Sequence, residues 1–282
     1  MSFTLHVPRP LRAALALVVL LALAGATYQG VTTSLERRRY PHPGRLVDVG
    51  GHQLQIHCTG TGRPVVVLEA PAAGLSASWT RVQLALTPVV RVCSYDRAGL
   101  GWSEQGEGAF EPARVPEELH ALLEGASERP PYVVAGQGLG AAFAAAFARR
   151  FPELTTALVQ LDPPEASADR RALGRMPGAM PWLARVGLLR VIDSGARRGE
   201  LDPASRAFMN RPDHLTRAAL ELAKWDDAVR LASSPVTGAD GAPPHVATTT
   251  AALPGPLGTE RGAEAAVAAI RQAVLKAGKG RS

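Results

Sequence analysis

A strand that runs through a glycine-rich turn directly into a helix is the feature that most restricts the fold of this chain. The strand covers 132–135, the turn 136–140 and the alanine-rich helix 141–151. Further apolar runs typical of buried parallel strands, and the helical patterns between them, lie at 65–68, 76–86, 89–95, 116–124 and 157–161. This alternation predicts an α/β fold with a mostly parallel sheet and right-handed crossovers.

The sequence on either side completes the architecture. Period-2 alternation around Gly50-Gly51 predicts a hairpin over 46–58. From 170 to 231 the pattern is helical only, which predicts a cap over the carboxyl edge of the sheet, where ligands of open α/β folds bind. A strand at 245–251 and an amphipathic helix at 263–277 follow. The resemblance described below implies that this C-terminal part of the sheet is shortened.

These patterns divide the chain into five expected parts. They are a signal or membrane segment over 1–28, a linker over 29–44, an α/β core over 45–165, a helical cap over 166–231, and a strand and helix that complete the core over 232–282.

The N-terminal segment contains an uninterrupted uncharged stretch, Ala13 to Tyr28, that follows Arg9 and Arg12. As a helix these 16 residues would be about 24 Å long, against a hydrocarbon core of about 30 Å. The small residues at 24–26 match a signal-peptidase site. We expect a hydrophobic helix that enters the membrane, with the domain anchored or exported outside the cytoplasm; retention and cleavage both stay open.

Composition excludes several other classes of function. The net charge of +6 comes almost wholly from scattered arginines without interleaved aromatic residues, so no nucleic-acid partner is expected. Two cysteines, Cys58 and Cys93, are too few for a disulfide scaffold or for a metal site, and no metal or other cofactor is expected. They form either a single bridge or a pair of buried small hydrophobic side chains.

The glycine-rich turn has the spacing of a nucleophile elbow, Gly-x-Ser-x-Gly, in which the outer glycines allow close packing of strand and helix. The helix N-terminus behind such a turn stabilises an oxyanion. In this chain the central residue is Gly138, so the nucleophile position carries no side chain.

The chain resembles the α/β-hydrolase superfamily, in particular its secreted or membrane-anchored members. The resemblance rests on Cys-Ser-Tyr-Asp-Arg-Ala-Gly-Leu-Gly-Trp-Ser over 93–103, together with the segments at 44–52, 58–60 and 117–123. It implies an eight-stranded sheet with Gly138 at the vestigial nucleophile position. It also implies that Ala72, Gln137 and Leu139 occupy the binding positions of the oxyanion loop and elbow.

The departures from the family pattern are correlated. Members carry a histidine in a Gly-His motif before the last helix, and aligning Ala263-Glu264 with the family's Pro-Glu puts Pro256 on that histidine. The stretch before it is too short for a second strand and crossover. The oxyanion loop over 69–74 has proline and alanines where relatives have mostly glycine.

Few residues could substitute for the missing groups. Asp162, at the end of a strand, is the best surviving acid. We expect Asp96 to cap or pair with Arg97 locally, Ser103 to be structural, and His214, in the cap, to lie on the surface.

Two classes of function follow from these patterns. The first is a catalytically impaired hydrolase-fold protein that binds a ligand or partner, with a small apolar or ester-like ligand under the cap and the membrane bound through the N-terminal helix. The alternative is an active ester or amide hydrolase with a non-standard catalytic site. A decaying gene product is a third reading, compatible with the shortened sheet.

Overall fold

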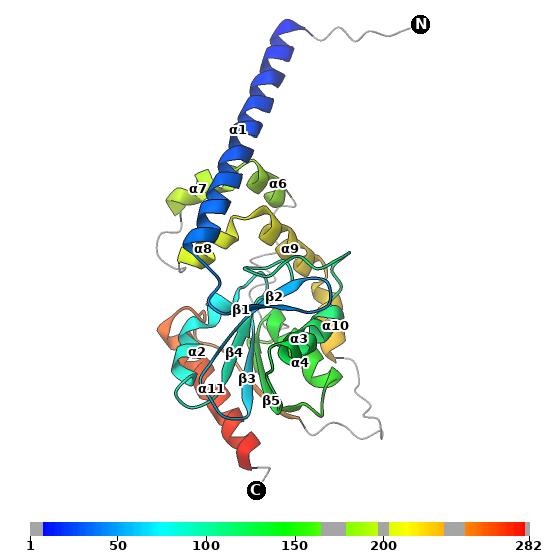
Figure 1. Ribbon diagram of the computed structural model, residues 1–282, viewed down its shortest axis with the longest axis vertical. Helices are drawn as coiled ribbons and strands as arrows, with labels where there is room; N and C mark the ends of the chain where they lie inside the picture. The colour runs from blue at the N-terminus through cyan, green and yellow to red at the C-terminus, as the bar shows by residue number, and fades with distance from the viewer. Residues whose placement is uncertain (1–7, 165–178, 197–202, 234–245, 280–282) are drawn as a thin grey trace, which may run out of the picture.

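The computed structural model describes residues 8–164, 179–196, 203–233 and 246–279 (Figure 1). Within these ranges seven strands form one sheet in the order β1-β2-β4-β3-β5-β6-β7. The strands are β1 Arg45–Asp48, β2 Gln53–Thr59, β3 Val65–Glu69, β4 Val92–Tyr95, β5 Tyr132–Gln137, β6 Thr155–Leu161 and β7 Ala247–Ala251. The pairs β1–β2 and β2–β4 are antiparallel, and every other neighbouring pair is parallel. The mostly parallel sheet expected from the sequence is confirmed.

Helices cover both faces of this sheet (Figure 1). On one face lie η1 Ser76–Trp79, α2 Thr80–Leu86 and α11 Glu260–Lys279. On the other lie α3 Arg114–Gly125 and α4 Leu139–Arg150. The apolar strand residues alternate between these two cores; Val66 and Leu68 face α2 and α11, whereas Val65 and Val67 face the opposite core. Two buried faces explain why the central strands are continuous apolar runs.

The cap is helical in its described part. It consists of α6 Met180–Arg185, α7 Leu188–Ala196, α8 Pro203–Met209, α9 Pro212–Ala223 and α10 Trp225–Ser233. After the cap the chain returns through β7 and α11, close to the expected bounds. The seven described strands are one fewer than the eight that the resemblance implies.

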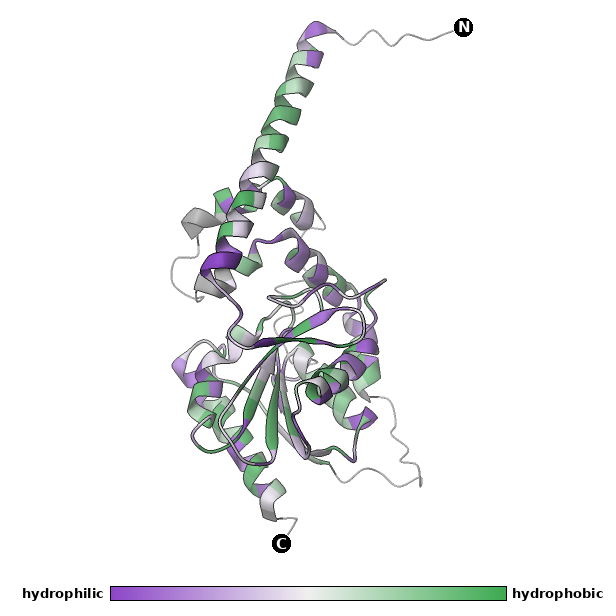
Figure 2. Ribbon diagram, in the orientation of Figure 1, coloured by the Kyte–Doolittle hydropathy of each residue, from purple (hydrophilic) through white to green (hydrophobic). Residues whose placement is uncertain are grey.

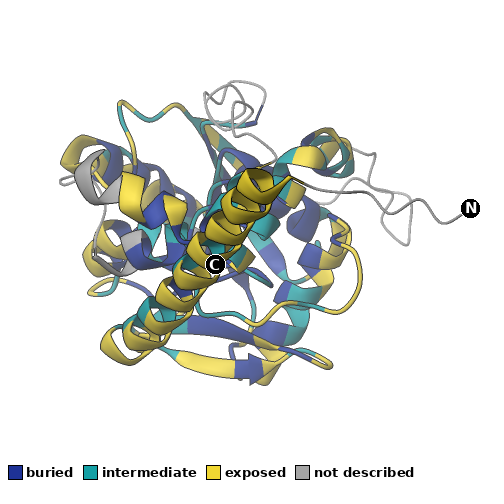
Figure 3. Cartoon of the chain, turned by 90° about the horizontal axis from the view of Figure 1, so that it is seen from above, coloured by how far each residue is buried: buried dark blue, intermediate teal, exposed yellow. Residues whose placement is uncertain are grey.

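The N-terminal helix is longer than expected. Helix α1 runs from Arg9 to Arg39, so most of the expected linker over 29–44 is helical. The reason is packing: Gln29 is buried, its amide donates to the Asn210 carbonyl at 3.1 Å, and Arg190 of α7 donates to its side-chain oxygen at 2.7 Å. By length and composition α1 could cross a membrane. Its apolar N-terminal half projects from the body and is exposed to solvent (Figures 2 and 3).

The two cysteines form a disulfide. Cys58 on β2 and Cys93 on β4 are direct partners in the antiparallel register, with their Cα atoms 4.0 Å apart. The Glu128 carboxylate lies within 4.8 Å of both sulfurs, but it is paired with Arg91 at 2.6 Å. Because the sulfurs are bonded to each other, this cluster is a covalent cross-link between the hairpin and the sheet.

The disulfide gives the first prediction. It joins residues 35 apart in the sequence, and a closed loop of that size is expected to stabilise the fold by about 3–4 kcal/mol. Replacing both cysteines by alanine should therefore lower the free energy of unfolding by that order, as measured by urea titration in detergent. A dithiothreitol treatment of the wild-type chain should give the same loss. An unfolding midpoint that reductant leaves unchanged would contradict the bridge.

Candidate functional site

The elbow has the backbone that its sequence predicts. Gly138 precedes α4 with φ 57° and ψ −124°, and its N–H donates to the Leu161 carbonyl at 3.0 Å. A Cβ atom on Gly136 would lie 2.2 Å from the Gly140 carbonyl oxygen, and one on Gly140 would lie 2.3 Å from the Ala70 carbonyl oxygen. The outer glycines are therefore required by packing, whereas the buried central position supplies no nucleophile.

Asp162 lies at the elbow, where its hydrogen bonds link the ends of three strands. Its carboxylate accepts hydrogen bonds from the Gln137 amide at 3.0 Å and from the Leu253 N–H at 2.8 Å. Its own N–H donates to the Ala251 carbonyl at 2.9 Å. Both carboxylate oxygens are thus occupied by β5 and by the segment after β7. Asp162 and Gln137 therefore lie together, and their hydrogen bond holds the ends of two strands.

Cap side chains cover the expected oxyanion positions. Ala72 and Leu139 are buried in one apolar cluster, and helix α10 contributes Trp225 and Ala228 to the same cluster. Phe110, Val115 and Phe143 complete it. The expected oxyanion positions Ala72 and Leu139 are therefore buried against helix α10 of the cap.

The main feature that the sequence reasoning missed is a buried ion network around Arg97. Its Nε and Nη2 atoms donate to the Glu221 carboxylate of α9 at 2.8 and 2.9 Å. Its Nη1 atom donates to Glu69, the last residue of β3, at 2.6 Å, and the Tyr95 hydroxyl donates to the same carboxylate. All three charged side chains are almost completely buried.

The same network holds the oxyanion loop. Arg97 Nη1 donates to the Ala70 carbonyl at 2.7 Å, and Nη2 donates to the Pro71 carbonyl at 3.0 Å. The Glu221 carboxylate accepts a hydrogen bond from the Ala73 N–H at 3.2 Å. The Glu221 carboxylate of the cap therefore binds a backbone N–H of the oxyanion loop one residue after Ala72, the expected donor.

Two local roles were expected of Asp96, capping and pairing with Arg97. The pairing is not observed, because Arg97 pairs with Glu69 and Glu221. The Asp96 carboxylate accepts from the backbone N–H groups of Ser76 at 2.6 Å and Trp102 at 3.0 Å, so its expected capping role is confirmed. Ser103 is structural, as expected: its hydroxyl donates to the Asp96 carbonyl at 2.5 Å.

The sequence contains one signal from which the ion network could have been predicted. Glu69 stands at the end of a buried strand, and a charged side chain at such a position needs a partner.

Electrostatics keep Arg97 and Glu221 in their charged forms. Burial alone would raise the pKa of Glu221, but Arg97, and to a lesser extent Arg217, hold it at about 2. Burial likewise opposes the charge on Arg97, whereas the two carboxylates raise its pKa. The pKa of Glu69 is raised by burial, against the attraction of Arg97. Glu221 is the carboxylate most firmly held as an anion.

The expectation that His214 lies on the surface is wrong. The side chain is 2% exposed in α9, and neither ring nitrogen makes a hydrogen bond of good geometry. Burial lowers its pKa to about 4, although Glu221 favours the charged form. His214 is therefore neutral near pH 7 and packs beside the ion network.

No proton acceptor is present at Pro256. This residue is exposed between β7 and α11, and its carbonyl accepts from the Thr259 N–H at 2.9 Å at the start of the last helix. The other described histidines are engaged elsewhere; His52 lies 3.7 Å from Glu118, and His120 stacks on Phe151. His6 and His245 lie outside the described residues.

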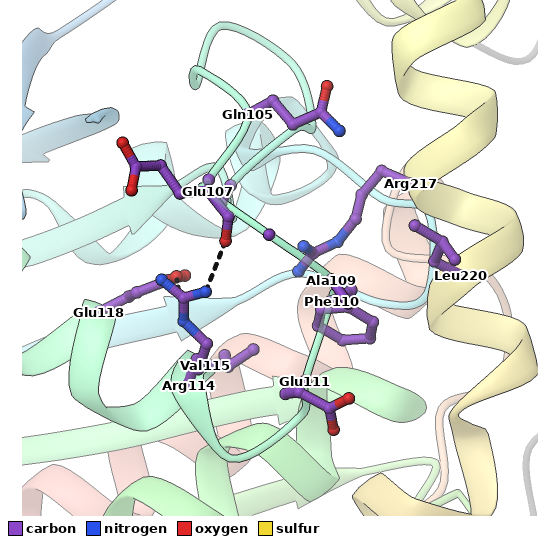
Figure 4. Close-up of a pocket in the computed structure, with 13 residues that line it drawn as sticks. Gln105, Glu107, Ala109, Phe110, Glu111, Arg114, Val115, Glu118, Arg217 and Leu220 are labelled. Carbon is purple, nitrogen blue, oxygen red and sulfur yellow. Dashed lines mark hydrogen bonds and ion pairs between the residues drawn. The ribbon is translucent and has the colours of Figure 1, made fainter. Parts of the chain in front are cut away.

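Two cavities lie outside the elbow. The first, of about 30 Å³, lies between the 105–111 loop, α3 and α9, where Arg114 donates to the Glu107 carbonyl and Arg217 lies over Phe110 (Figure 4). It has room for about one water molecule. The second, of about 360 Å³, is mostly apolar and includes Tyr40 and Trp102 in its lining. A volume of that size accommodates a small organic ligand.

Comparisons with known proteins agree with this architecture. No family model matches the chain. An AB hydrolase superfamily protein of Gibberella zeae is 37% identical over 93 residues, 32% of this chain and 28% of that protein. A 2-hydroxy-6-oxo-2,4-heptadienoate hydrolase of Pseudomonas putida is 31% identical over 119 residues, 41% of this chain and 43% of that protein. The chain spans less than half the length of each of these curated relatives.

Solved structures extend the likeness over most of the chain. Cfl2 from Burkholderia cenocepacia superposes with a TM-score of 0.63 at 20% identity, covering 82% of this chain and 95% of that one. A thermophilic esterase from Thermogutta terrifontis superposes with a TM-score of 0.56 at 18% identity, covering 83% and 98%. The chain has the α/β-hydrolase fold, and the resemblance seen in its sequence is supported.

The buried histidine gives the second prediction. Between pH 6.5 and 4 the unfolded His214 binds a proton that the folded one excludes, so stability falls as the pH falls through that window. The loss attributable to His214 is on the order of 3 kcal/mol. The variant His214→Leu should unfold at a similar urea concentration at pH 7 and lose less stability at pH 4.5. Equal pH slopes for both proteins would contradict this assignment.

Proposed function

We propose that this protein is a catalytically impaired α/β-hydrolase-fold protein that is held in a membrane and binds a ligand or partner instead of hydrolysing one. The observation that carries the proposal is an elbow that keeps its backbone geometry around Gly138, a residue with no side chain to act as a nucleophile. Beside it, the Glu221 carboxylate of the cap binds the Ala73 N–H of the oxyanion loop, next to the expected donor Ala72.

The residues at the family's catalytic positions support the loss of turnover. Gly138 provides no atom that could attack an acyl group, and Pro256 provides no basic nitrogen. In a serine–histidine unit, loss of the nucleophile or the base costs about 10⁶-fold in turnover. Asp162 stands at the elbow, but both of its oxygens are engaged by neighbouring strands.

The N-terminal helix and the disulfide support a membrane-anchored domain outside the cytoplasm. Disulfides persist mainly in oxidising compartments. Cleavage at 24–26 would cut α1 in the middle of a continuous helix, beside the point where Gly25 meets the cap. Because the part of α1 after this point is bound to α7 by buried polar contacts, we favour a retained anchor over a cleaved signal.

A binding role fits the larger cavity better than the volume under the cap. Trp225 packs in the same apolar cluster as Ala72 and Leu139, whereas the cavity of about 360 Å³ is open and mainly apolar. Its lining includes the segment between α1 and β1, through Tyr40 and Pro41. A small apolar or ester-like ligand is therefore expected there, close to the end of the anchor helix.

Fluorophosphonate labelling tests the proposal. The purified full chain and its Gly138→Ser variant should both stay unlabelled, because the base is absent. Turnover of p-nitrophenyl acetate should equal that of a heat-treated control for both proteins.

Two results would contradict it. Stoichiometric labelling of the wild-type chain, abolished by one point mutation, would support an active ester or amide hydrolase with a non-standard site. A gain of several orders of magnitude in Gly138→Ser would show that a base is present and that the alignment of Pro256 with the histidine is wrong.

A further inference from the structure

We propose that helices α6 and α7 form a second membrane contact, lying in the lipid headgroup region beside the point where α1 enters the bilayer. This inference rests on the proposed role of α1 as a membrane anchor and adds a surface of the cap to it. Its occupant is a lipid bilayer.

The two helices expose an apolar face. Trp182 is 69% exposed and Ile192 is 60% exposed, although both are large hydrophobic side chains. Val186, Leu188 and Val191 are also exposed on the same pair of helices. Isolated exposed hydrophobic residues are ordinary, but a contiguous set of this kind marks an interaction surface.

The face has a fixed position relative to α1. A Cβ atom on Gly25 would lie 2.0 Å from the Val186 carbonyl oxygen, so glycine allows the backbones to touch there. Arg190 of α7 donates to the Glu36 carboxylate at 2.5 and 2.7 Å and to Gln29 at 2.7 Å. In Figure 1, α6 and α7 flank α1 at the base of its projecting part.

The free length of α1 is too short to span a bilayer. Between Arg12 and the contact at Gly25 only Ala13 to Ala24 are free, which is about 18 Å of helix. The hydrocarbon core is about 30 Å thick. A spanning α1 must therefore draw the contact at Gly25 toward the bilayer, with local thinning of the bilayer taking up the rest of the difference of about 12 Å, and this brings α6 and α7 to the interface.

Side chains on α1 itself agree with that depth. On the exposed side of the helix Tyr28, Val31 and Leu35 remain apolar well below Gly25. The polar Gln29 and Glu36 instead contact the cap. Large apolar side chains thus continue on the exposed side of α1 beyond the projecting part, alongside Thr27 and Ser34, whose hydroxyls donate to backbone carbonyls of the helix.

The chemistry of the α6–α7 face suits the headgroup region. Trp182 is the kind of amphipathic ring that gathers at membrane interfaces. The Arg185 guanidinium lies 4.9 Å from the centre of that ring, where it can pair with lipid phosphate while the ring faces the acyl chains.

Tryptophan quenching tests this contact. The full chain is reconstituted in phosphatidylcholine vesicles that contain brominated acyl chains, and vesicle flotation checks anchoring separately. Trp79 and Trp225 are buried, Trp102 is partly buried and α1 contains no tryptophan, so Trp182 dominates the quenchable signal. We expect most of the Trp182 emission to be quenched, and Trp182→Phe to reduce the quenched signal several-fold.

A matched pair of variants separates lipid contact from general surface change. Ile192→Asp should reduce the quenching of Trp182 at least twofold. Leu275→Asp, at a 67% exposed position near the end of α11, should leave it unchanged. Both replace an exposed aliphatic side chain by the same charge.

The two proposals fail in distinguishable ways. If the wild-type chain does not float with vesicles, α1 is not an anchor and the proposed membrane attachment fails. If it floats but Trp182 is not quenched, the α6–α7 contact is wrong while the anchor stands. Concentration-dependent dimerisation in detergent that Ile192→Asp abolishes would assign the face to a second copy and likewise overturn the inference.

Discussion

The guanidinium of Arg97 holds the sheet, the oxyanion loop and the cap together. An arginine has five N–H donors, and the Arg97 guanidinium donates five hydrogen bonds. They reach Glu69, the carbonyls of Ala70 and Pro71, and both oxygens of Glu221. A buried charge without partners would be strongly destabilising, so this geometry restricts how the cap can sit on the sheet.

The position of the cap links the candidate site to helix α1. Glu221 binds α9 to the oxyanion loop, Trp225 at the start of α10 packs in one apolar cluster with Leu139, and α9 in turn packs against α6. Helix α6 adjoins α7, which binds α1 through Arg190. The arrangement that covers the elbow edge of the sheet is thus continuous with the one that orients the body on helix α1.

Much of the fold could be predicted because its signals are local. The elbow glycines, the hairpin at Gly50-Gly51 and the apolar strands each report on neighbours close in sequence. The end of α1 was misjudged because residues 29–39 form a helix only through contacts with the cap more than 150 residues away. His214 was misplaced for a similar reason, since an isolated helical pattern does not show what covers each face.

Only the backbone of the candidate site could be predicted from the sequence. Gly138 and the flanking glycines lie where the pattern puts them, and Asp162 reaches the same edge. The partnership of Arg97 with Glu221 spans 124 residues, and no local pattern in the sequence links the two. The side chains above an elbow depend on how the cap helices pack over the sheet. The same helical patterns in a sequence are compatible with many such packing arrangements.

Amide hydrogen exchange over 72–76 tests most directly whether the oxyanion loop is bound by the chain's own cap. The N–H groups of Ala73, Gly74 and Ser76 are hydrogen-bonded to Glu221, Pro71 and Asp96. In the full chain in detergent, this segment should exchange nearly as slowly as β3 and β5 and accelerate at least tenfold in Glu221→Gln. Exchange at the rate of an unstructured peptide, with β3 and β5 still protected, would show that the site is open and contradict the account.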